Sequence, residues 1–178
     1  RDPVHQKLGM LYELTSQFEL AKKEYEILLS RKQNEEALLN SLGLVSIKLG
    51  LVDEAIGYFT RVTKINARNI WALNNLAIAY RRLKQFDPCI QYHKMAIDLD
   101  GTNAVLFHNL GNSYFEMGDY LAAMVAFEKV LLVDQNYHKA DRKIGLAQFN
   151  LGNLEDAFLY LKKAVAEEPD EPAILDEL

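Results

Sequence analysis

The chain is poor in cysteine and in basic charge, and each shortage removes a class of protein. Its 178 residues include a single cysteine, Cys89, which cannot form an internal disulfide and has no partner for a redox or metal motif. Lysine and arginine number 20 against 25 acidic residues. The resulting net charge of −5 argues against a general binder of phosphate backbones, which needs a dominant basic surface. We therefore predict no nucleic-acid partner.

Long apolar runs are also missing. No stretch approaches the roughly 20 apolar residues that a helix needs to cross a bilayer, and residues 1–5 lack the apolar core of a signal peptide. We predict a soluble protein without direct membrane insertion, cytoplasmic by default, with no targeting signal in this chain. Because it does not begin with methionine, we interpret it as a fragment or a processed product, whose missing part could carry a signal or an anchor.

Motifs for catalysis and metal binding are absent as well. The sequence contains no HExxH, paired-cysteine, Walker or dinucleotide-loop motif, and its four histidines, His5, His93, His108 and His138, are scattered along it. We therefore predict no enzymatic activity, no cofactor and no metal. We interpret His93 as a core histidine with one hydrogen-bond partner and Cys89 as a small core residue.

What the sequence does contain is a period of 34 residues, uninterrupted by any insertion. One column holds small residues, each preceded by leucine or isoleucine: Gly9, Gly43, Ala77, Gly111 and Gly145. Twelve residues later comes a second small column: Ala21, Ala55, Cys89, Ala123 and Ala157. Four residues beyond it stands a column of mostly large side chains: Tyr25, Phe59, His93, Phe127 and Leu161.

Each 34-residue unit carries two helical stripes separated by a short break. Leu73, Leu76 and Tyr80 show the spacing of the first stripe, and Met117-Gly118-Asp119 shows a break, with glycine where one helix must stop. Small residues in the middle of both helices let the two helices approach closely. Because one helix pair cannot bury its own apolar face, neighbouring pairs must stack into an all-α solenoid.

These columns resemble the tetratricopeptide repeat, and residues 109–114 followed by Gly118-Asp119-Tyr120 are close to its consensus. The resemblance implies a right-handed superhelical solenoid of antiparallel helix pairs, forming a single domain over residues 1–178. The repeats are residues 2–35, 36–69, 70–103, 104–137 and 138–171, with residues 172–178 as the start of a truncated or capping helix.

Some positions depart from the family pattern. The usual aromatic or aliphatic opening residue is His5 in the first repeat and Asp141 in the fifth, and the tyrosine column contains Ser46 and Gln148. We expect looser packing at these positions.

The resemblance also implies which face binds a partner. Repeat positions 2, 5, 6, 9, 12 and 13 lie opposite the packing stripe of each first helix, and in the family this is the concave, ligand-binding surface. In this chain that face carries an excess of five positive charges, which would attract an acidic partner. We predict that a partner contacts Asn40, Trp71, Asn74, Asn75, Ile78, Arg81, Arg82, His108, Asn109, Asn112, Phe115, Lys139, Arg142, Lys143 and Phe149.

Two kinds of side chain on this face suit an extended peptide. Asparagine amides can donate to and accept from a peptide backbone, while Trp71 and Phe115 supply apolar pockets. Asn75 and Asn109 occupy the same place one repeat apart, resembling the asparagine ladder of the glycosyltransferase that carries such repeats. The alternative is an exposed helix face with a mixture of residues and no binding role.

Chaperone-binding members of the family clamp a terminal carboxylate with two asparagines, two lysines and an arginine. Asn109, Lys139 and Lys143 match that pattern, with a lysine in place of the arginine, whereas Asn74 and Ile78 replace its first lysine and asparagine. The clamp is therefore incomplete.

Three hypotheses follow for the function. The first is a scaffold or adaptor module that binds a protein or peptide, acidic or extended, in the concave groove. The second is the substrate-recognition arm of a larger enzyme, for example a glycosyltransferase, whose catalytic domain lies outside this chain. The third is self-association through exposed solenoid ends, where Leu175 and Leu178 take the repeat positions of Leu39 and Leu42.

Overall fold

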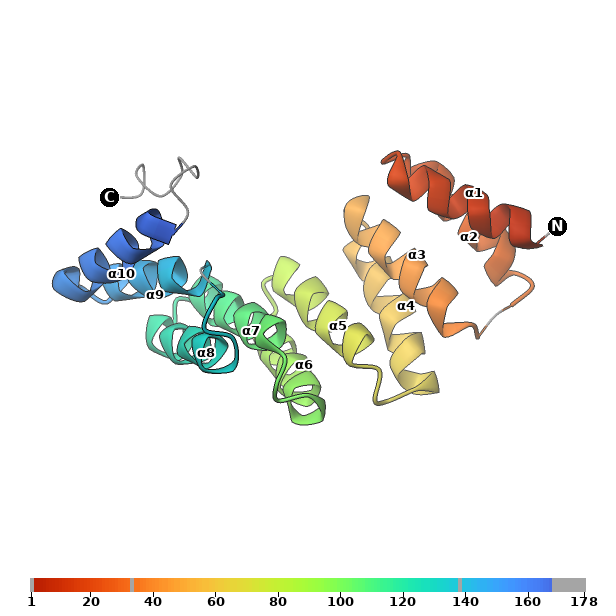
Figure 1. Ribbon diagram of the computed structural model, residues 1–178. Coiled ribbons are helices and arrows are strands. Elements are labelled where there is room, and N and C mark those ends of the chain that lie inside the picture. The colour runs from red at the N-terminus through yellow and green to blue at the C-terminus, as the bar shows by residue number, and fades with distance from the viewer. Residues whose placement is uncertain (1, 33, 138, 168–178) are drawn as a thin grey trace. The chain divides into compact units, whose positions relative to one another are not determined.

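Ten α-helices make up the part of the chain that the structure describes (Figure 1). The computed structural model describes residues 2–32, 34–137 and 139–167, and no strand occurs among them. The helices are α1 (Asp2–Leu14), α2 (Phe18–Leu29), α3 (Glu36–Lys48), α4 (Val52–Ile65), α5 (Ile70–Arg82), α6 (Phe86–Leu99), α7 (Ala104–Met117), α8 (Tyr120–Val133), α9 (Lys139–Asn150) and α10 (Leu154–Glu167). They follow one another in antiparallel pairs, which confirms the predicted all-α fold. The predictions for residues 172–178, including Leu175 and Leu178, lie outside the described residues.

The chain divides into two compact units, residues 1–92 and residues 93–178, and the boundary falls inside α6. In the first unit α1 to α5 pack in chain order, each on its neighbour, and in the second unit α7 to α10 do the same. The prediction of a single domain over the whole chain stays a prediction.

A glycine in the middle of a first helix makes room for a ring on the second helix of the same pair. In the second unit, a Cβ added at Gly111 would lie 2.6 Å from Cε1 of Phe127, whose ring is fully buried. Gly43 stands in the same relation to Phe59 in the first unit. At the glycines of this 34-residue column, a large side chain of the second helix thus occupies the volume of the missing side chain, an aromatic ring in the first, second and fourth repeats and Leu161 in the fifth.

The break between α7 and α8 has the geometry that its sequence predicts. Gly118 adopts a left-handed conformation with φ of 88° directly after Met117, the last residue of α7. Asp119 then accepts a hydrogen bond from the backbone N–H of Ala122 and caps the start of α8. A residue with a Cβ would be strained at the first position, and a residue without a side-chain acceptor would leave the second helix uncapped.

Two polar residues in the second unit, His93 and Ser113, are buried and bonded to each other. The Ser113 hydroxyl donates to the backbone oxygen of Asn109 at 2.9 Å, so its oxygen accepts from Nε2 of the fully buried His93 at 3.1 Å. This confirms the interpretation of His93 as a core histidine. Cys89 is buried as well, as predicted.

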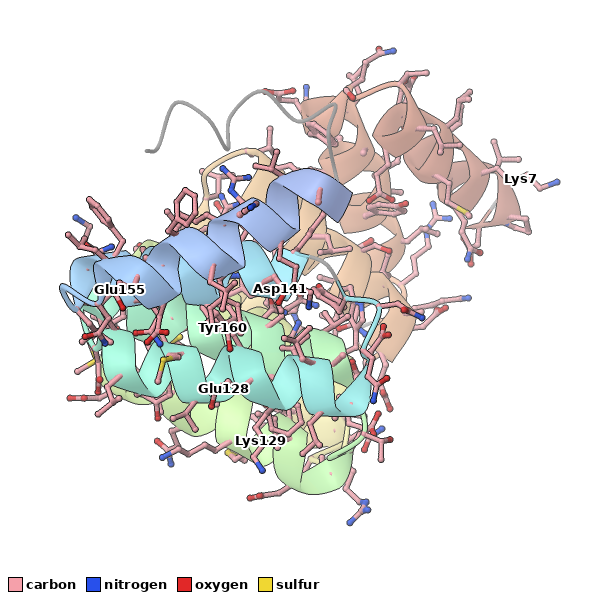
Figure 2. The ribbon with its side chains drawn as sticks, turned by 60° about the vertical axis from the view of Figure 1, so that its left-hand side comes forward. Lys7, Glu128, Lys129, Asp141, Glu155 and Tyr160 are labelled. Atoms are coloured by element: carbon pink, nitrogen blue, oxygen red, sulfur yellow. The ribbon has the colours of Figure 1, made fainter. Side chains whose placement is uncertain are left out.

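Asp141, in the first turn of α9, is the most unusual of these buried polar residues (Figure 2). It is only 1% exposed, and both of its carboxylate oxygens lie 3.0 Å from Nζ of Lys163 on α10. We expected looser packing at Asp141 and at Ser46, yet both side chains are buried.

Candidate protein-binding site

The predicted partner-binding residues divide between the two units, and each set is described by itself. All of them lie on the first helices of their pairs, and none is fully buried. The first unit holds Asn40, Trp71, Asn74, Asn75, Ile78, Arg81 and Arg82. The second unit holds His108, Asn109, Asn112, Phe115, Lys139, Arg142, Lys143 and Phe149.

In the first unit three cations gather where α3 and α5 end. Nη1 of Arg82 donates to the backbone oxygen of Ile47 at 3.4 Å, which holds Arg82 beside Lys48, the last residue of α3. Arg81 precedes Arg82 in the last turn of α5. We call Lys48, Arg81 and Arg82 the basic cluster. Helix carboxyl ends favour cations, and Lys48 and Arg82 remain exposed to solvent, so the cluster can meet an acidic group.

The amide of Asn75 has one partner within its own helix. Nδ2 of Asn75 donates to the backbone oxygen of Trp71 at 2.9 Å, along its own helix. One of the two amide N–H donors is therefore already used, which leaves Asn75 the second N–H and its oxygen for a peptide. The Trp71 ring lies edge-on to Phe59, with centroids 5.8 Å apart, and is 41% exposed.

In the second unit the predicted residues of α7 and α9 come together. Nζ of Lys143 lies 5.6 Å from the centre of the Phe115 ring, close enough for a cation–π contact between the two helices. Lys139 and Arg142 stand on the same helix as Lys143, and Phe149 at its other end is 47% exposed. This face therefore combines cations with exposed aromatic surface.

His108 belongs to the packing of the second unit. Its ring lies 5.6 Å from that of Phe127 and 5.2 Å from that of Tyr137, between centroids. These two aromatic rings fix the orientation of the His108 ring. We therefore expect the other predicted residues of this face to make most of the contact with a partner.

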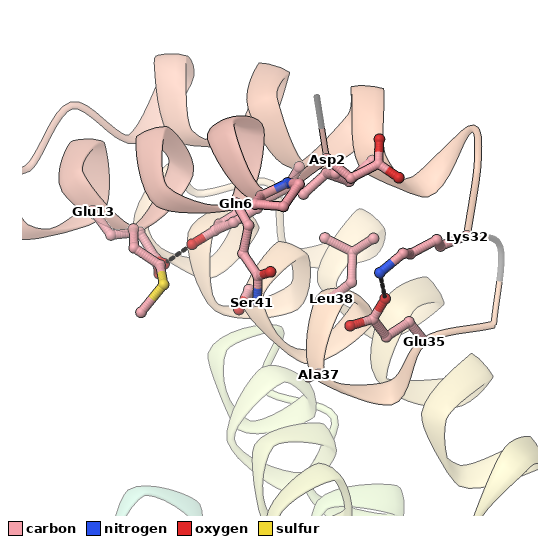
Figure 3. A pocket seen from close by; sticks show the side chains of 12 residues that line it. Asp2, Gln6, Glu13, Lys32, Glu35, Ala37, Leu38 and Ser41 are labelled. Atoms are coloured by element: carbon pink, nitrogen blue, oxygen red, sulfur yellow. Dashed lines mark hydrogen bonds and ion pairs between the residues drawn. The ribbon is translucent and has the colours of Figure 1, made fainter.

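A pocket lies between α1, α2 and α3 in the first unit, and six of its lining residues stand at repeat positions of the predicted binding face, although none of the six was among the predicted contact residues (Figure 3). Its volume is about 330 Å³, and Glu13 lies at one end, with Asp2, Lys32 and Glu35 at the other. It is lined by Asp2, Pro3, Gln6, Met10, Glu13, Tyr25, Leu28, Lys32, Glu35, Ala37, Leu38 and Ser41. We call it the α1–α3 pocket. One feature of the sequence indicates this pocket: Ala37 is small, whereas the same position of the next repeat holds the large Trp71.

Tyr25 forms the inner wall of the α1–α3 pocket, and its hydroxyl donates to the Glu13 carboxylate. Burial raises the pKa of the Tyr25 hydroxyl above its ordinary value, and the hydrogen bond to Glu13 raises that pKa further. The folded chain therefore holds this hydroxyl protonated.

We expect stability to fall in alkali for this reason. Because the folded pKa of Tyr25 exceeds the unfolded one, its contribution is complete below about pH 10 and is lost as the pH rises further. The free energy of unfolding, measured by urea titration, should decrease by up to about 1.4 kcal/mol per pH unit there. The decrease should be smaller in Tyr25→Phe, and an equal decrease in both proteins would contradict the assignment.

No described helix combines the length and the apolar character required to cross a membrane. Within residues 2–32, 34–137 and 139–167, no group of three or more histidine, cysteine, aspartate or glutamate side chains is placed to hold a metal ion.

Residues 36–69 and residues 108–172 each match a family model described as tetratricopeptide repeat. The chain belongs to the tetratricopeptide repeat family. With its helix-pair fold, this membership identifies the chain as a protein-interaction scaffold.

Relatives of known name cover most of this tetratricopeptide repeat chain but are much longer. FlbA of Caulobacter vibrioides is 25% identical over 150 residues, which are 84% of this chain and 25% of FlbA. RNA polymerase II-associated protein 3 of Mus musculus is 26% identical over 115 residues, which are 65% of this chain and 17% of that protein. The chain thus spans a quarter or less of the length of these relatives.

Solved structures show the same fold. A crystal structure of MamA superposes with a TM-score of 0.82 at 24% identity, covering 97% of this chain and 94% of MamA. MamA from Desulfovibrio magneticus RS-1 gives a TM-score of 0.86 at 15% identity, covering 96% and 97%. YrrB, described as a TPR protein with an unusual peptide-binding site, gives 0.76 at 20% identity, covering 97% and 89%.

Proposed function

We propose that this tetratricopeptide repeat chain binds an acidic segment of a partner protein on the exposed faces of its first helices. The observation that carries the proposal is the gathering of cations on these faces in a chain whose net charge is −5. In the first unit the Arg82 to Ile47 contact holds the basic cluster together. In the second unit Lys143 lies against Phe115, on the helix that also carries Lys139 and Arg142.

Charge and apolar surface would act at different stages of binding. The cations raise the rate of encounter with an acidic segment and fix its orientation, and salt weakens this effect. Exposed aromatic surface, at Trp71 in the first unit and Phe149 in the second, then supplies contact area for apolar side chains between the acidic residues. The similar fold of YrrB, which is described as having a peptide-binding site, supports a peptide as the ligand.

The test is a charge reversal on the proposed face of each unit. Lys48→Glu combined with Lys143→Glu should weaken binding of a fluorescein-labelled peptide of alternating glutamate and leucine by about tenfold or more, measured by fluorescence anisotropy. Raising the salt concentration should weaken binding to the wild type in the same direction.

The matched control carries the same change of charge on the second helices. Lys64 on α4 and Lys129 on α8 are both exposed, so Lys64→Glu combined with Lys129→Glu should leave binding unchanged. Circular dichroism must show both double variants folded. Equal losses in the two variants, or no loss in either, would rule out the first-helix faces as the binding site.

The second hypothesis, a substrate-recognition arm of a larger enzyme, stays a prediction. It requires an activity that the full-length protein has and this chain lacks, so a comparison of the two distinguishes it from a scaffold.

A further inference from the structure

The α1–α3 pocket stands where the next repeat places a tryptophan ring. Residues 34 positions apart occupy equivalent places in successive repeats, so Ala37 corresponds to Trp71 and Tyr25 corresponds to Phe59. In the next repeat the Trp71 ring lies edge-on to Phe59, with centroids 5.8 Å apart. Ala37 offers only a methyl group beside Tyr25, and a cavity of about 330 Å³ is left there. The fold therefore leaves space for one large side chain, and the described residues of this chain do not fill it.

The walls of the α1–α3 pocket suit a side chain with an apolar stem. Met10, Leu28 and Leu38 contribute aliphatic surface, and Leu28 and Leu38 are part of the buried core. The core packing holds Leu28 and Leu38 in position with or without an occupant, whereas Met10 is 54% exposed at the rim.

The charges of the pocket leave one carboxylate in excess. At one end Glu35 pairs with Lys32 at 3.1 Å, and Asp2 pairs with Arg31 at 2.6 Å, so these charges balance. At the other end Glu13 accepts one hydrogen bond, from the Tyr25 hydroxyl, although a carboxylate can accept about four.

Two further acceptors face this end of the pocket. Figure 3 shows the Gln6 side chain reaching toward Ser41, between Glu13 and Leu38. A cation placed there would meet the Glu13 carboxylate together with an amide oxygen and a hydroxyl oxygen. An anion would meet only repulsion from Glu13.

We infer that the α1–α3 pocket binds the side chain of an arginine supplied by a partner protein. The aliphatic stem lies along Met10 and Leu38, and the guanidinium group donates to Glu13. Arginine fits better than lysine because its planar group offers five donors, which can meet the Glu13 carboxylate and the neighbouring oxygens together. The inference rests on the proposed function only in taking a protein as the partner, and it adds a recognition element of opposite charge to the basic cluster.

The test uses a single-residue probe, so it does not depend on the partner's identity. Nα-acetyl-L-arginine N-methylamide, titrated against the isotope-labelled chain, should cause saturable NMR shifts at the backbone amides of Glu13, Leu38 and Ser41. The matching norleucine probe has an apolar stem without the charge and should bind at least about tenfold more weakly. Absence of saturable shifts, or equal binding of the norleucine or tryptophan probe, would overturn the inference.

Two variants test the pocket and its charge separately. Ala37→Trp copies the next repeat and should close the pocket, abolishing the shifts without lowering the melting temperature. Glu13→Gln keeps an acceptor for the Tyr25 hydroxyl but removes the charge, so binding of the arginine probe should weaken about tenfold while that of the norleucine probe stays the same. Glu19→Gln, on the exposed surface of α2, is the matched control and should change nothing.

The result is distinguishable from that for the proposed function. The Lys48→Glu, Lys143→Glu variant should bind the arginine probe as the wild type does. If the arginine probe fails while the acidic peptide still binds, only the pocket assignment is wrong. Undiminished shifts in both Ala37→Trp and Glu13→Gln would place the arginine elsewhere and overturn the inference.

Discussion

Replacing Lys163 by methionine is expected to lower the free energy of unfolding by about 1–3 kcal/mol. Asp141 is buried, and the ammonium group of Lys163, whose side chain is 51% exposed, is 3.0 Å from both of its oxygens. Methionine keeps the apolar stem but leaves a carboxylate inside the fold without its cation, which is far more costly than losing an exposed ion pair. Urea denaturation followed by circular dichroism measures the loss.

The double variant Asp141→Leu, Lys163→Met should recover most of that stability. Leucine occupies the same repeat position at Leu39 and Leu73, where it is buried, so the fold accepts an apolar residue there. Lys162→Met, at the exposed neighbouring position, is the control and should have little effect. A double variant as unstable as Lys163→Met alone would show that the loss does not come from the buried charge.

The same substitution, glycine to alanine, is expected to have opposite effects at two helical positions. At Gly111 the new Cβ would lie 2.6 Å from Cε1 of Phe127, and the buried ring has little room to move, so we expect a loss of about 1–3 kcal/mol. At Gly57, inside α4, nothing lies within 4 Å of the new Cβ. Alanine favours the helix there, so we expect a gain of up to about 1 kcal/mol.

Two probes separate these effects. Trp71, the chain's one tryptophan, reports by fluorescence on the first unit, which holds Gly57, while circular dichroism reports on both units. Effects of equal size and sign at Gly57 and Gly111 would contradict the assignment, because they would show that the contact with Phe127 does not determine the sensitivity of Gly111.

Much of the fold could be predicted from the sequence because its signals are local and repeated. The left-handed glycine at Gly118 and the cap at Asp119 act within one turn of chain, and each has the conformation that its residue type favours. The small residue at Gly111 and the ring at Phe127 are only 16 positions apart and recur with the period, so they identify the packing of each pair.

The candidate site was harder to predict because helical spacing specifies a face but not how its side chains are used. The spacing could not show that the Asn75 amide is engaged by Trp71 along its own helix, or that His108 is held by Phe127 and Tyr137. It also gave a net charge for the face without showing that Lys48 and Arg82 come together through the backbone of Ile47.

The sequence by itself determined the period, the helix pairs and the family, since these depend on residue types within one repeat. Only the tertiary structure decided where polar side chains find partners and where volume is left over. In the sequence, Asp141 is only a departure from the repeat pattern. In the structure, Lys163, 22 residues later, donates a hydrogen bond to its carboxylate. Likewise, the sequence shows Ala37 only as a small residue, whereas the packing of α1, α2 and α3 places a pocket beside it. Such features depend on distances between side chains of different helices, and the packing of the helices sets those distances.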